Sequence, residues 1–555
     1  MAPFTVDQLI AFALSHHRAG RFAEAEGIYR KILGESPAHP VALDYLGVLA
    51  LQTDRLELGA GILRQAVAVS PSNANAHTNL GECYRRLGKP HEAAAAFQEA
   101  IRLAPGGFVA HNNFGVALAE TGRFDEAIAA YRKAISADPG YADAYTNLCN
   151  ALLGAGRARE AVVEGERAVA LKPSSAAMQV NLGAALMAAG RCADAVAAYR
   201  RAIELDPRHA DAHSNLGNAL CAEGRVDEAL AASAKAIEVD PRLIQSHWNY
   251  AVILLRAGDF ERGWREYEWR WKTQAHFPKP PARFQPPRFP TPHWDGSPLQ
   301  GKTILLHTEQ GFGDAIQFCR YAPMVAPLGA EVIVECRAET REIFRSLPRV
   351  GAVVARGETL PRFDCHCPLM SLPLALGTTL RNVPATVPYL FPPPDIVGAW
   401  AARLDRGDGR AQVGLCWAGS PLHHDDRRRS ISLADLAPLA GLATFHSLQQ
   451  TPFDEGLAPP GMRLIDHSAA LTDFSQTAGL IANLDLIITV DTAVAHLAGA
   501  LGKPTWTLLA FYADWRWLTK RSDSPWYPTM RLFRQSEPGN WGQVIQRVAE
   551  AFVLH

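Results

Sequence analysis

Residues 121–139 read TGRFDEAIAAYRKAISADP, and this stretch decides the fold of the first half of the chain. Gly122 permits a tight turn, because a residue without a Cβ easily adopts the left-handed backbone conformation. Asp125 and Glu126 then lie near the start of a helix, where carboxylates favour the helix dipole. Pro139 ends that helix, because proline disfavours helical conformation in the residue before it.

The same pattern returns every 34 residues. Gly115, Ala127 and Ala134 are small and recur with it, so the two helices of each unit can approach closely. The phase is kept by prolines at Pro37, Pro71, Pro105, Pro139, Pro173, Pro207 and Pro241, and by turn glycines at Gly20, Gly88, Gly122, Gly156, Gly190, Gly224 and Gly258, with Asp54 in the missing place. This spacing resembles the tetratricopeptide repeat, and it predicts an α-helical solenoid of about seven to eight repeats over residues 1–272.

One polar position also recurs every 34 residues, and repeat arrays of this kind bind partners along a concave groove. Its members are Asn79, Asn113, Asn147, Asn181, Asn215 and Asn249. A line of amides can contact an extended peptide backbone without reading its sequence. The series resembles the asparagine ladder of the eukaryotic protein O-GlcNAc transferase, which implies a protein or peptide partner. The alternative is that these amides only bond neighbouring helices.

After Gly258 the repeat pattern changes. Aromatic residues from Trp264 to Trp271 stand at helical spacing and predict a helix that caps the last repeat. Residues 273–300 are rich in proline, which prevents regular structure, so they predict a stiff linker.

From Gly301 onward, short apolar runs alternate with helical stretches, which predicts an α/β region with parallel sheets. A proline-rich break at residues 383–394 divides this region into lobes at residues 301–394 and 395–555. Two Rossmann-like lobes are expected, with ligands at the carboxyl ends of the strands. The expected strands are 303–307, 331–336, 413–417, 444–448, 484–490 and 505–509.

A glycine pair with an acidic residue follows the first of these strands. Gly311 and Gly313 let the backbone approach a ligand, and the next helix offers its N-terminus. Asp314 at this position can act as a general base toward an acceptor hydroxyl. It can equally be a helix cap.

A second turn, after the apolar strand at residues 484–490, predicts a diphosphate site. Asp491, Thr492 and Ala493 lie where the strand ends and a helix begins, so free amides and the Thr492 hydroxyl can bind phosphate. His496 is one helical turn further and can reach the same ligand. The alternative is that the first two residues cap the helix and the histidine belongs to the core.

Residues 484–504 resemble the bacterial ADP-heptose lipopolysaccharide heptosyltransferases, as does Gly313-Asp314 after the first strand. The resemblance covers about residues 301–535 and implies a GT-B fold and inverting, metal-independent transfer. It also implies Asp314 as the base and Asp491, Thr492 and His496 at the donor nucleotide. Ala493 departs from the glycine common in that family. No Asp-x-Asp pair follows Gly301, and no metal or cofactor is expected.

Three arginines, Arg427, Arg428 and Arg429, follow the strand at residues 413–417. A cation here would neutralise a departing diphosphate without a metal ion. The related heptosyltransferases have a lysine in this region, and Arg429 is the expected counterpart. The alternative is a solvated charged loop. A further segment, residues 514–528, is rich in aromatic and basic side chains and can stack a base, line the acceptor entrance or simply pack.

Composition excludes several classes of partner. The chain has 55 Lys and Arg against 56 Asp and Glu, so no basic field recruits nucleic acid. No apolar run is long enough to span a membrane. The N-terminus lacks the features of a signal peptide, and the nine cysteines lack a Cys-x-x-Cys pair, so a cytoplasmic protein is expected.

The layout resembles bacterial repeat-bearing protein glycosyltransferases, including those that modify flagellin. The function expected from this resemblance is transfer of a sugar from a nucleotide-sugar donor to a Ser or Thr hydroxyl of a protein held by the repeats. One alternative is a heptosyltransferase-like enzyme that acts on a glycan or lipid acceptor. The other is a non-catalytic scaffold.

Overall fold

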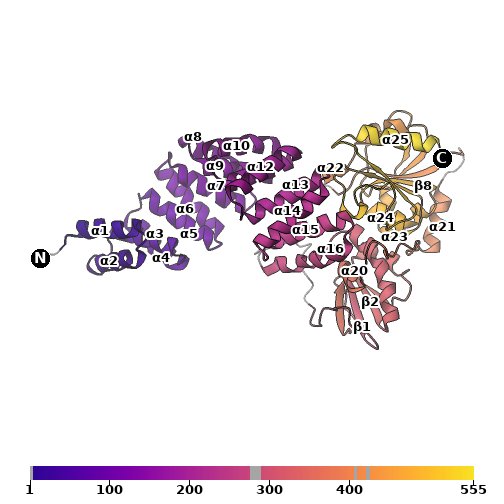
Figure 1. The fold of residues 1–555 in the computed structure, drawn as a ribbon, viewed down its shortest axis with the longest axis horizontal. Helices are drawn as coiled ribbons and strands as arrows, with labels where there is room; N and C mark the ends of the chain where they lie inside the picture. The colour runs from indigo at the N-terminus through magenta and orange to yellow at the C-terminus, as the bar shows by residue number, and fades with distance from the viewer. Residues whose placement is uncertain (1–3, 276–288, 405–408, 421–425, 555) are drawn as a thin grey trace. The chain divides into compact units, whose positions relative to one another are not determined.

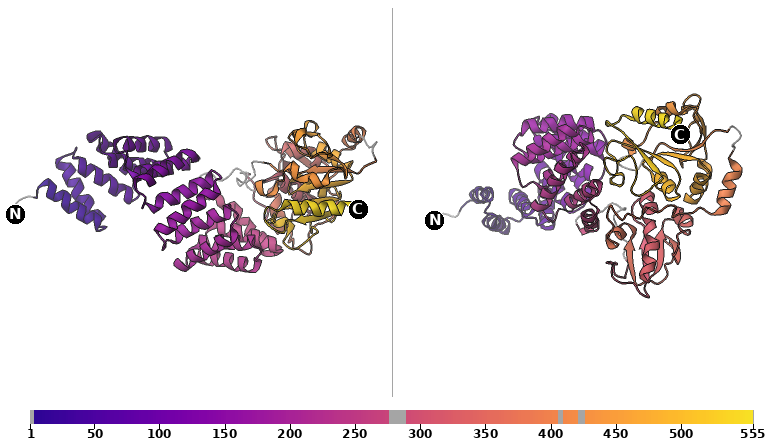
Figure 2. Two further views of the ribbon diagram at one scale, coloured as in Figure 1. Left: turned by 90° about the horizontal axis from the view of Figure 1, so that it is seen from above. Right: turned by 45° about the vertical axis from the view of Figure 1, so that its right-hand side comes forward.

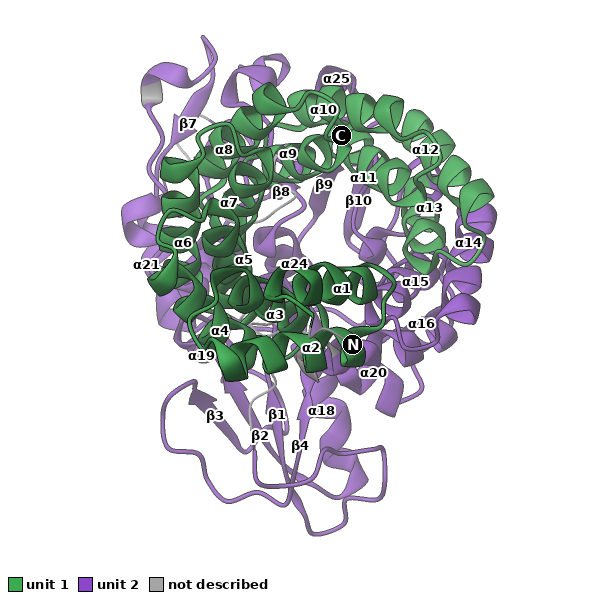
Figure 3. Ribbon diagram, turned by 90° about the vertical axis from the view of Figure 1, so that its left-hand side faces the viewer, with its two compact units in different colours: residues 1–219 green, residues 220–555 purple. Residues whose placement is uncertain are grey.

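The computed structural model describes residues 4–275, 289–404, 409–420 and 426–554. The chain divides into two compact units, Met1–Ala219 and Leu220–His555, drawn in green and purple in Figure 3. The first unit is built from repeat helices, and the second contains the last repeat helices together with the strands. Residues 276–288 of the predicted linker lie outside the described residues.

The repeat array consists of paired helices, so the predicted α-helical solenoid is confirmed. The turn within a pair takes the left-handed conformation, with φ of 79° at Gly122 and 58° at Asp54, the one non-glycine in this series. The pairs, coloured from indigo to magenta in Figure 1, are α1 (Val6–Arg18) with α2 (Phe22–Glu35), α3 (Pro40–Gln52) with α4 (Leu56–Val69), α5 (Ala74–Arg86) with α6 (Pro90–Leu103), α7 (Phe108–Glu120) with α8 (Phe124–Ala137), α9 (Ala142–Gly154) with α10 (Ala158–Leu171), α11 (Ala176–Ala188) with α12 (Cys192–Leu205), α13 (Ala210–Ala222) with α14 (Val226–Val239), and α15 (Ile244–Ala257) with α16 (Phe260–Tyr267).

Small residues allow the two helices of a pair to approach closely, as predicted. A Cβ on Gly115 would lie 2.6 Å from the ring of Tyr131 in the partner helix. A Cβ on Gly183 would lie 2.5 Å from the ring of Tyr199. Both distances are far below a normal carbon–carbon contact, so the observed packing requires glycine at these positions.

The second unit contains two parallel sheets, which Figure 2 shows as separate groups of strands. Sheet A has the order β3-β2-β1-β4, and sheet B has the order β10-β9-β8-β5-β6-β7. Counted from β5, sheet B follows the strand order of a doubly wound nucleotide-binding fold, with a reversal between β5 and β8. The predicted α/β region is confirmed. Its strands are β1 (Thr303–His307), β2 (Glu331–Cys336), β3 (Ala352–Ala355), β4 (Cys365–Pro368), β5 (Gln412–Cys416), β6 (Thr444–Ser447), β7 (Arg463–Ile465), β8 (Leu486–Val490), β9 (Thr505–Leu509) and β10 (Met530–Arg534).

Helices connect these strands. The segment after β1 forms α17 and α18 as separate short helices, because Pro323 lacks an N–H group and its ring clashes with a helical carbonyl. None of the helices in the described ranges combines the length and apolar character needed to cross a bilayer. The helices are α17 (Phe312–Phe318), α18 (Ala322–Val325), α19 (Ala338–Phe344), α20 (Leu372–Ala375), α21 (Pro394–Arg403), α22 (Asp426–Arg429), α23 (Phe474–Ala482), α24 (Ala493–Ala500) and α25 (Trp541–Val553), with short 3-10 segments η1 (Glu268–Ala275) and η9 (Trp515–Trp517).

The aromatic residues after the last repeat do more than cap it. Trp264 of α16 packs edge-on against Phe318 of α17 and Trp515 of η9, with ring centroids 6.1 Å and 5.3 Å apart. Phe260 stacks on Trp526 at 5.7 Å. These rings form one core with sheet A and with the segment after β9, so the end of the repeat array is built into the α/β unit.

Candidate functional site

The turn after β1 places Asp314 at the start of α17. Gly311 precedes the helix, and its N–H donates to Oδ2 of Asp314 at 2.8 Å. The capping contact is therefore present. Nη2 of Arg516 donates to Oδ1 of Asp314, and 19% of the carboxylate side chain remains exposed. The role of Asp314 as a base stays a prediction.

The turn after β8 places Asp491 and Thr492 beside the point where the strand order of sheet B reverses. Thr492 is the N-cap residue of α24. Its Oγ1 lies 3.2 Å from Oγ1 of Thr489 and 3.7 Å from Sγ of Cys416, the last residue of β5. Ligands of such sheets bind at this kind of reversal, and the first N–H groups of α24 have no acceptor within their helix. The turn therefore offers donors to an anion.

The two predicted turns meet in space. A Cβ on Gly313 would lie 2.8 Å from Cδ2 of His496 and 3.7 Å from Cα of Ala493. The start of α17 therefore lies against the start of α24. Gly313 allows this approach of the two helices. Its predicted role in the approach of a ligand stays a prediction.

His496 is buried within this contact, with 5% of its surface exposed. Its Nδ1 lies 2.9 Å from the hydroxyl of Tyr527, and its ring stacks on Trp517 with centroids 5.3 Å apart. Burial lowers the pKa of His496 well below its usual range, and the charge of Arg516 acts in the same direction. The imidazole is therefore neutral at pH 7, with its Cδ2–Nε2 edge toward α17.

Arg429 lies at the same strand ends. Its Nη1 donates to the carbonyl oxygen of Asp491 at 2.9 Å, and its Nε lies 3.3 Å from Oδ1 of Asp426. About one fifth of its side chain, 20%, is exposed. The structure thus brings Arg429 to the turn after β8. His423 and His424 of the same loop lie outside the described residues.

The carboxyl group of Asp491 is half-buried beside other charges. Burial raises its pKa to about 6, and the negative charge of Asp514 adds to the effect, while Arg429 and Arg516 oppose it. Protonation of Asp491 therefore changes the charge of the site close to neutral pH.

Arg516 is the residue of the site whose role sequence reasoning missed. It lies in η9 after β9, contacts Asp314, and donates from Nη1 to Oδ1 of Asp514 at 2.8 Å. The available signal was a charged pair within an aromatic segment at the carboxyl end of a strand. That signal indicates that the segment lies near a ligand. It does not predict the contact of Arg516 with Asp314, which lies 202 residues away in the sequence.

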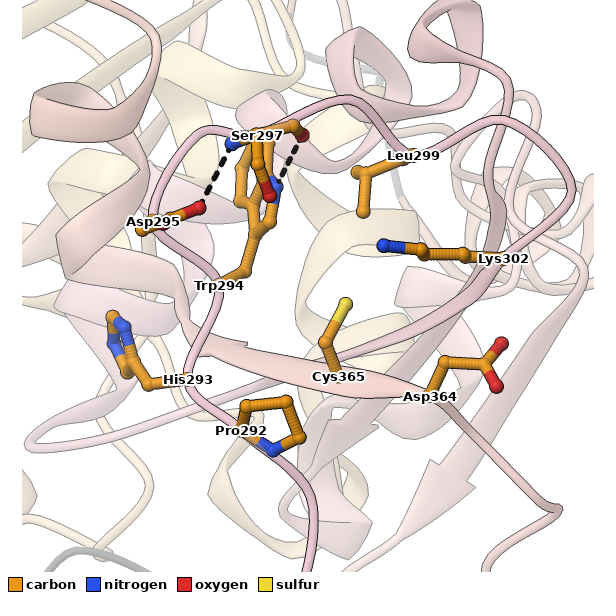
Figure 4. A pocket seen from close by; sticks show the side chains of 9 residues that line it. All are labelled: Pro292, His293, Trp294, Asp295, Ser297, Leu299, Lys302, Asp364 and Cys365. Carbon is orange, nitrogen blue, oxygen red and sulfur yellow. Dashed lines mark hydrogen bonds between the residues drawn. The ribbon is translucent and has the colours of Figure 1, made fainter.

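A cavity of about 180 Å³ lies elsewhere in the unit, beside β4. Figure 4 shows Asp295 and Lys302 on its wall, with Trp294 donating from Nε1 to the carbonyl of Ser297 at 2.9 Å. Its lining includes none of the predicted site residues. Among the residues that the structure describes, no group of three or more His, Cys, Asp and Glu side chains is placed to hold a metal ion.

The asparagine series lies at one position on the first helix of successive repeats. Asn147 and Asn181 line a cavity of about 380 Å³ in the first unit. Nδ2 of Asn147 also donates to Oδ1 of Asn112 at 2.9 Å, so part of the series bonds neighbouring helices. Asn249 is buried, and its Oδ1 accepts from Gln245 at 2.8 Å. The remaining members are half-buried and stand at Asn79 in α5, Asn113 in α7 and Asn215 in α13.

Comparison with known families supports both halves of this description. Residues 72–139, 118–186 and 180–244 match tetratricopeptide repeats. Residues 463–524 match glycosyltransferase family 9 (heptosyltransferase). The second match contains the turn after β8, α24 and η9.

Similar proteins cover parts of the chain. Protein FlbA of Caulobacter vibrioides is 30% identical over 335 residues, which are 54% of this chain and 54% of FlbA, so the chain spans about half the length of this curated relative. The crystal structure of MamA is 26% identical with a TM-score of 0.28 and covers 30% of this chain and 92% of MamA. The tetratricopeptide repeat protein YrrB is 22% identical with a TM-score of 0.30 and covers 34% of this chain and 96% of YrrB. The chain thus carries tetratricopeptide repeats followed by a C-terminal glycosyltransferase family 9 (heptosyltransferase) domain.

Proposed function

We propose that the chain is a glycosyltransferase that moves a sugar from a nucleotide-sugar donor to a Ser or Thr hydroxyl of a protein. The observation that carries this proposal is the contact of Gly313 with His496 and Ala493, which brings the start of α17, where Asp314 lies, against the start of α24. A base and an anion site that lie side by side are the two parts that sugar transfer from a nucleotide requires.

In the proposed reaction, the donor diphosphate binds at the N-terminus of α24. Thr492 and the first amides of that helix donate to it, and Arg429 neutralises the charge that develops as it leaves. Asp314 accepts the proton of the acceptor hydroxyl, whose oxygen attacks the anomeric carbon on the face opposite the diphosphate. The configuration of that carbon is inverted, and the reaction needs no metal ion.

The acceptor is proposed to be a flagellin-like protein that is held in the repeat groove of a cytoplasmic enzyme. The cavity that Asn147 and Asn181 line is polar and large enough for side chains of an extended peptide. Binding there raises the effective concentration of the hydroxyl at the catalytic site.

Intact-mass analysis of candidate acceptor proteins, incubated with the full chain and nucleotide sugars, tests the proposal. A mass increase of one sugar is expected, and Asp314→Asn should lower its rate by about 10²- to 10⁴-fold, the usual contribution of a general base. The double variant Asn147→Ala, Asn181→Ala should lose transfer to protein yet retain slow hydrolysis of the donor. Normal transfer by Asp314→Asn would rule out the assignment of the base.

A glycan or lipid acceptor is the second candidate, and the heptosyltransferase description of the matching family favours it. In that case the same double variant in the groove should transfer the sugar to the small acceptor at an unchanged rate. EDTA should leave the reaction unaffected under either proposal.

A further inference from the structure

An ion pair joins the proposed base to the other lobe. Asp314 belongs to α17, which follows sheet A, whereas Arg516 follows β9 of sheet B. One oxygen of Asp314 accepts from the N–H of Gly311 and the other from Arg516. These two donors use two of the roughly four lone-pair sites of the carboxylate, and the guanidinium also takes up space beside the oxygen that it contacts. As it stands, the carboxylate of Asp314 is occupied.

The guanidinium of Arg516 is held by several groups at once. Its Nη1 donates to Asp514 at 2.8 Å, its Nε donates to Oε1 of Gln317 at 2.6 Å, and its plane lies over the ring of Trp515 at 4.3 Å. Only 8% of the side chain is exposed. Although burial opposes the charge, the two aspartates raise the pKa of Arg516 above its ordinary value, so it stays a cation.

The anion site next to this pair carries charges of both signs, because Arg429 and Arg516 act on Asp491 together with Asp514. Asp491, Asp514 and Asp314 all lie around the turn, and a diphosphate would add to their negative charge. The charge of Arg516 acts on both Asp491 and His496, which places its guanidinium within electrostatic range of the N-terminus of α24. A diphosphate carries more charge than one carboxylate and offers more acceptor oxygens, so it competes effectively for a guanidinium.

We propose that Arg516 is a donor-binding residue that makes the base depend on the donor. Without donor, it occupies Asp314. When the donor diphosphate binds at α24, the guanidinium turns toward the diphosphate, and an oxygen of Asp314 becomes free for the acceptor hydroxyl. The carboxylate of Asp314 and the donor diphosphate compete for the guanidinium of Arg516, so donor binding and the release of Asp314 are linked. This inference rests on the proposed function, and it makes donor binding precede productive acceptor binding.

A double-mutant cycle on the full chain tests the competition. The probe is the nucleoside diphosphate that binds most tightly among ADP, UDP, GDP and CDP, measured by calorimetry. Asp314→Asn should tighten its binding about 5-fold, because Arg516 loses its charged competitor. Asparagine still has an oxygen that accepts from Gly311, so the helix cap survives. In an Arg516→Gln background the same change should alter binding by less than about 2-fold.

Two further variants separate this role from a structural one. Arg516→Lys keeps the charge and should retain part of the tightening, because lysine lacks the planar fork of arginine. Arg521→Gln breaks the exposed pair of Arg521 with Asp523 in the same segment and should leave the dissociation constant unchanged. In steady-state kinetics, Arg516→Gln should raise KM for the donor and also lower kcat, because it removes a contact to the departing diphosphate.

The binding measurements separate failure of the role of Arg516 from failure of the proposed donor site. The role of Arg516 is overturned if the probe binds but Asp314→Asn does not tighten its binding. It is also overturned if Asp314→Asn tightens binding equally in the unaltered chain and in Arg516→Gln. In either case the proposed function stands. If none of the four diphosphates binds the unaltered chain, the proposed donor site itself is wrong, and the inference falls with it.

Discussion

Asp491 shows how a single residue of the site responds to its surroundings. Burial and the charge of Asp514 raise its pKa to about 6, from the value of 3.8 for an ordinary aspartate. The folded protein therefore binds this proton more tightly than the unfolded chain does. Between about pH 4 and pH 6 the folded state binds more protons at Asp491 than the unfolded chain does, so the stability of the folded state decreases as the pH rises through this window. Above about pH 6, Asp491 causes no further change in stability.

Asp491→Asn should remove the loss of stability that the charged form of Asp491 causes. The free energy of unfolding of the C-terminal unit should increase by about 1–3 kcal/mol at pH 7.5, where aspartate is charged, and by much less at pH 4.5. Urea unfolding followed by tryptophan fluorescence measures this unit alone, because all 12 tryptophans lie between residues 248 and 541. An equal gain at both pH values would show that the charge of Asp491 is not the cause.

At the scale of elements, the contact between α17 and α24 depends on one glycine. The ring of His496 cannot retreat easily from a side chain at Gly313, because it is bonded to Tyr527 and stacked on Trp517. A Cβ at this position therefore forces the two helices apart. Since these helices position Asp314 and Thr492, the separation should affect the site more than the fold.

Gly313→Ala should cost about 1–3 kcal/mol of stability through overpacking, and sugar transfer should decrease by at least about 10-fold, because displaced catalytic groups lose rate steeply. Gly398→Ala is the matched control. Gly398 lies within α21 with nothing near the added Cβ, so alanine should stabilise the unit by about 0.5–1 kcal/mol and leave transfer unchanged. Equal behaviour of the two variants would contradict the steric explanation.

The elements that the sequence predicts well are those with a long or repeated pattern. The repeat helices follow from prolines and glycines in phase, and β8 follows from a continuous apolar run. The strands β3, β4, β7 and β10 escaped prediction. Length alone is not the reason, but β7 has only three residues, β4 reads CHCP and β10 is interrupted by arginines, so these three lack a continuous apolar run. In the site, the turn residues were identifiable because strand ends and helix starts are local features. The contact of Arg516 with Asp314 was not, because it arises only when segments that follow two different sheets fold together.

At the scale of the whole molecule, the end of the repeat array belongs to the C-terminal unit. Arg270 of η1 is fully buried, and its Nη2 donates to Glu309 at 3.0 Å and to Ser371 at 2.7 Å. Glu309 lies in the turn that leads from β1 to Gly311. The hydroxyl of Tyr267 accepts from Gln310 of the same turn at 3.2 Å. The residues before the predicted linker therefore hold the turn that presents Asp314.

A chain that begins at residue 273 should consequently fold poorly, whereas one that begins at residue 174 should keep the C-terminal unit intact. The shorter chain loses Arg270 and leaves Glu309 buried without its partner, which costs about 3–5 kcal/mol. It also exposes the rings of Phe318, Trp515 and Trp526, which α16 covers, so aggregation is expected. Soluble yield and the urea midpoint of tryptophan fluorescence compare the two chains. If both chains unfold at the same midpoint as the full protein, residues 174–272 contribute nothing to the stability of the C-terminal unit, and the junction is only a connector.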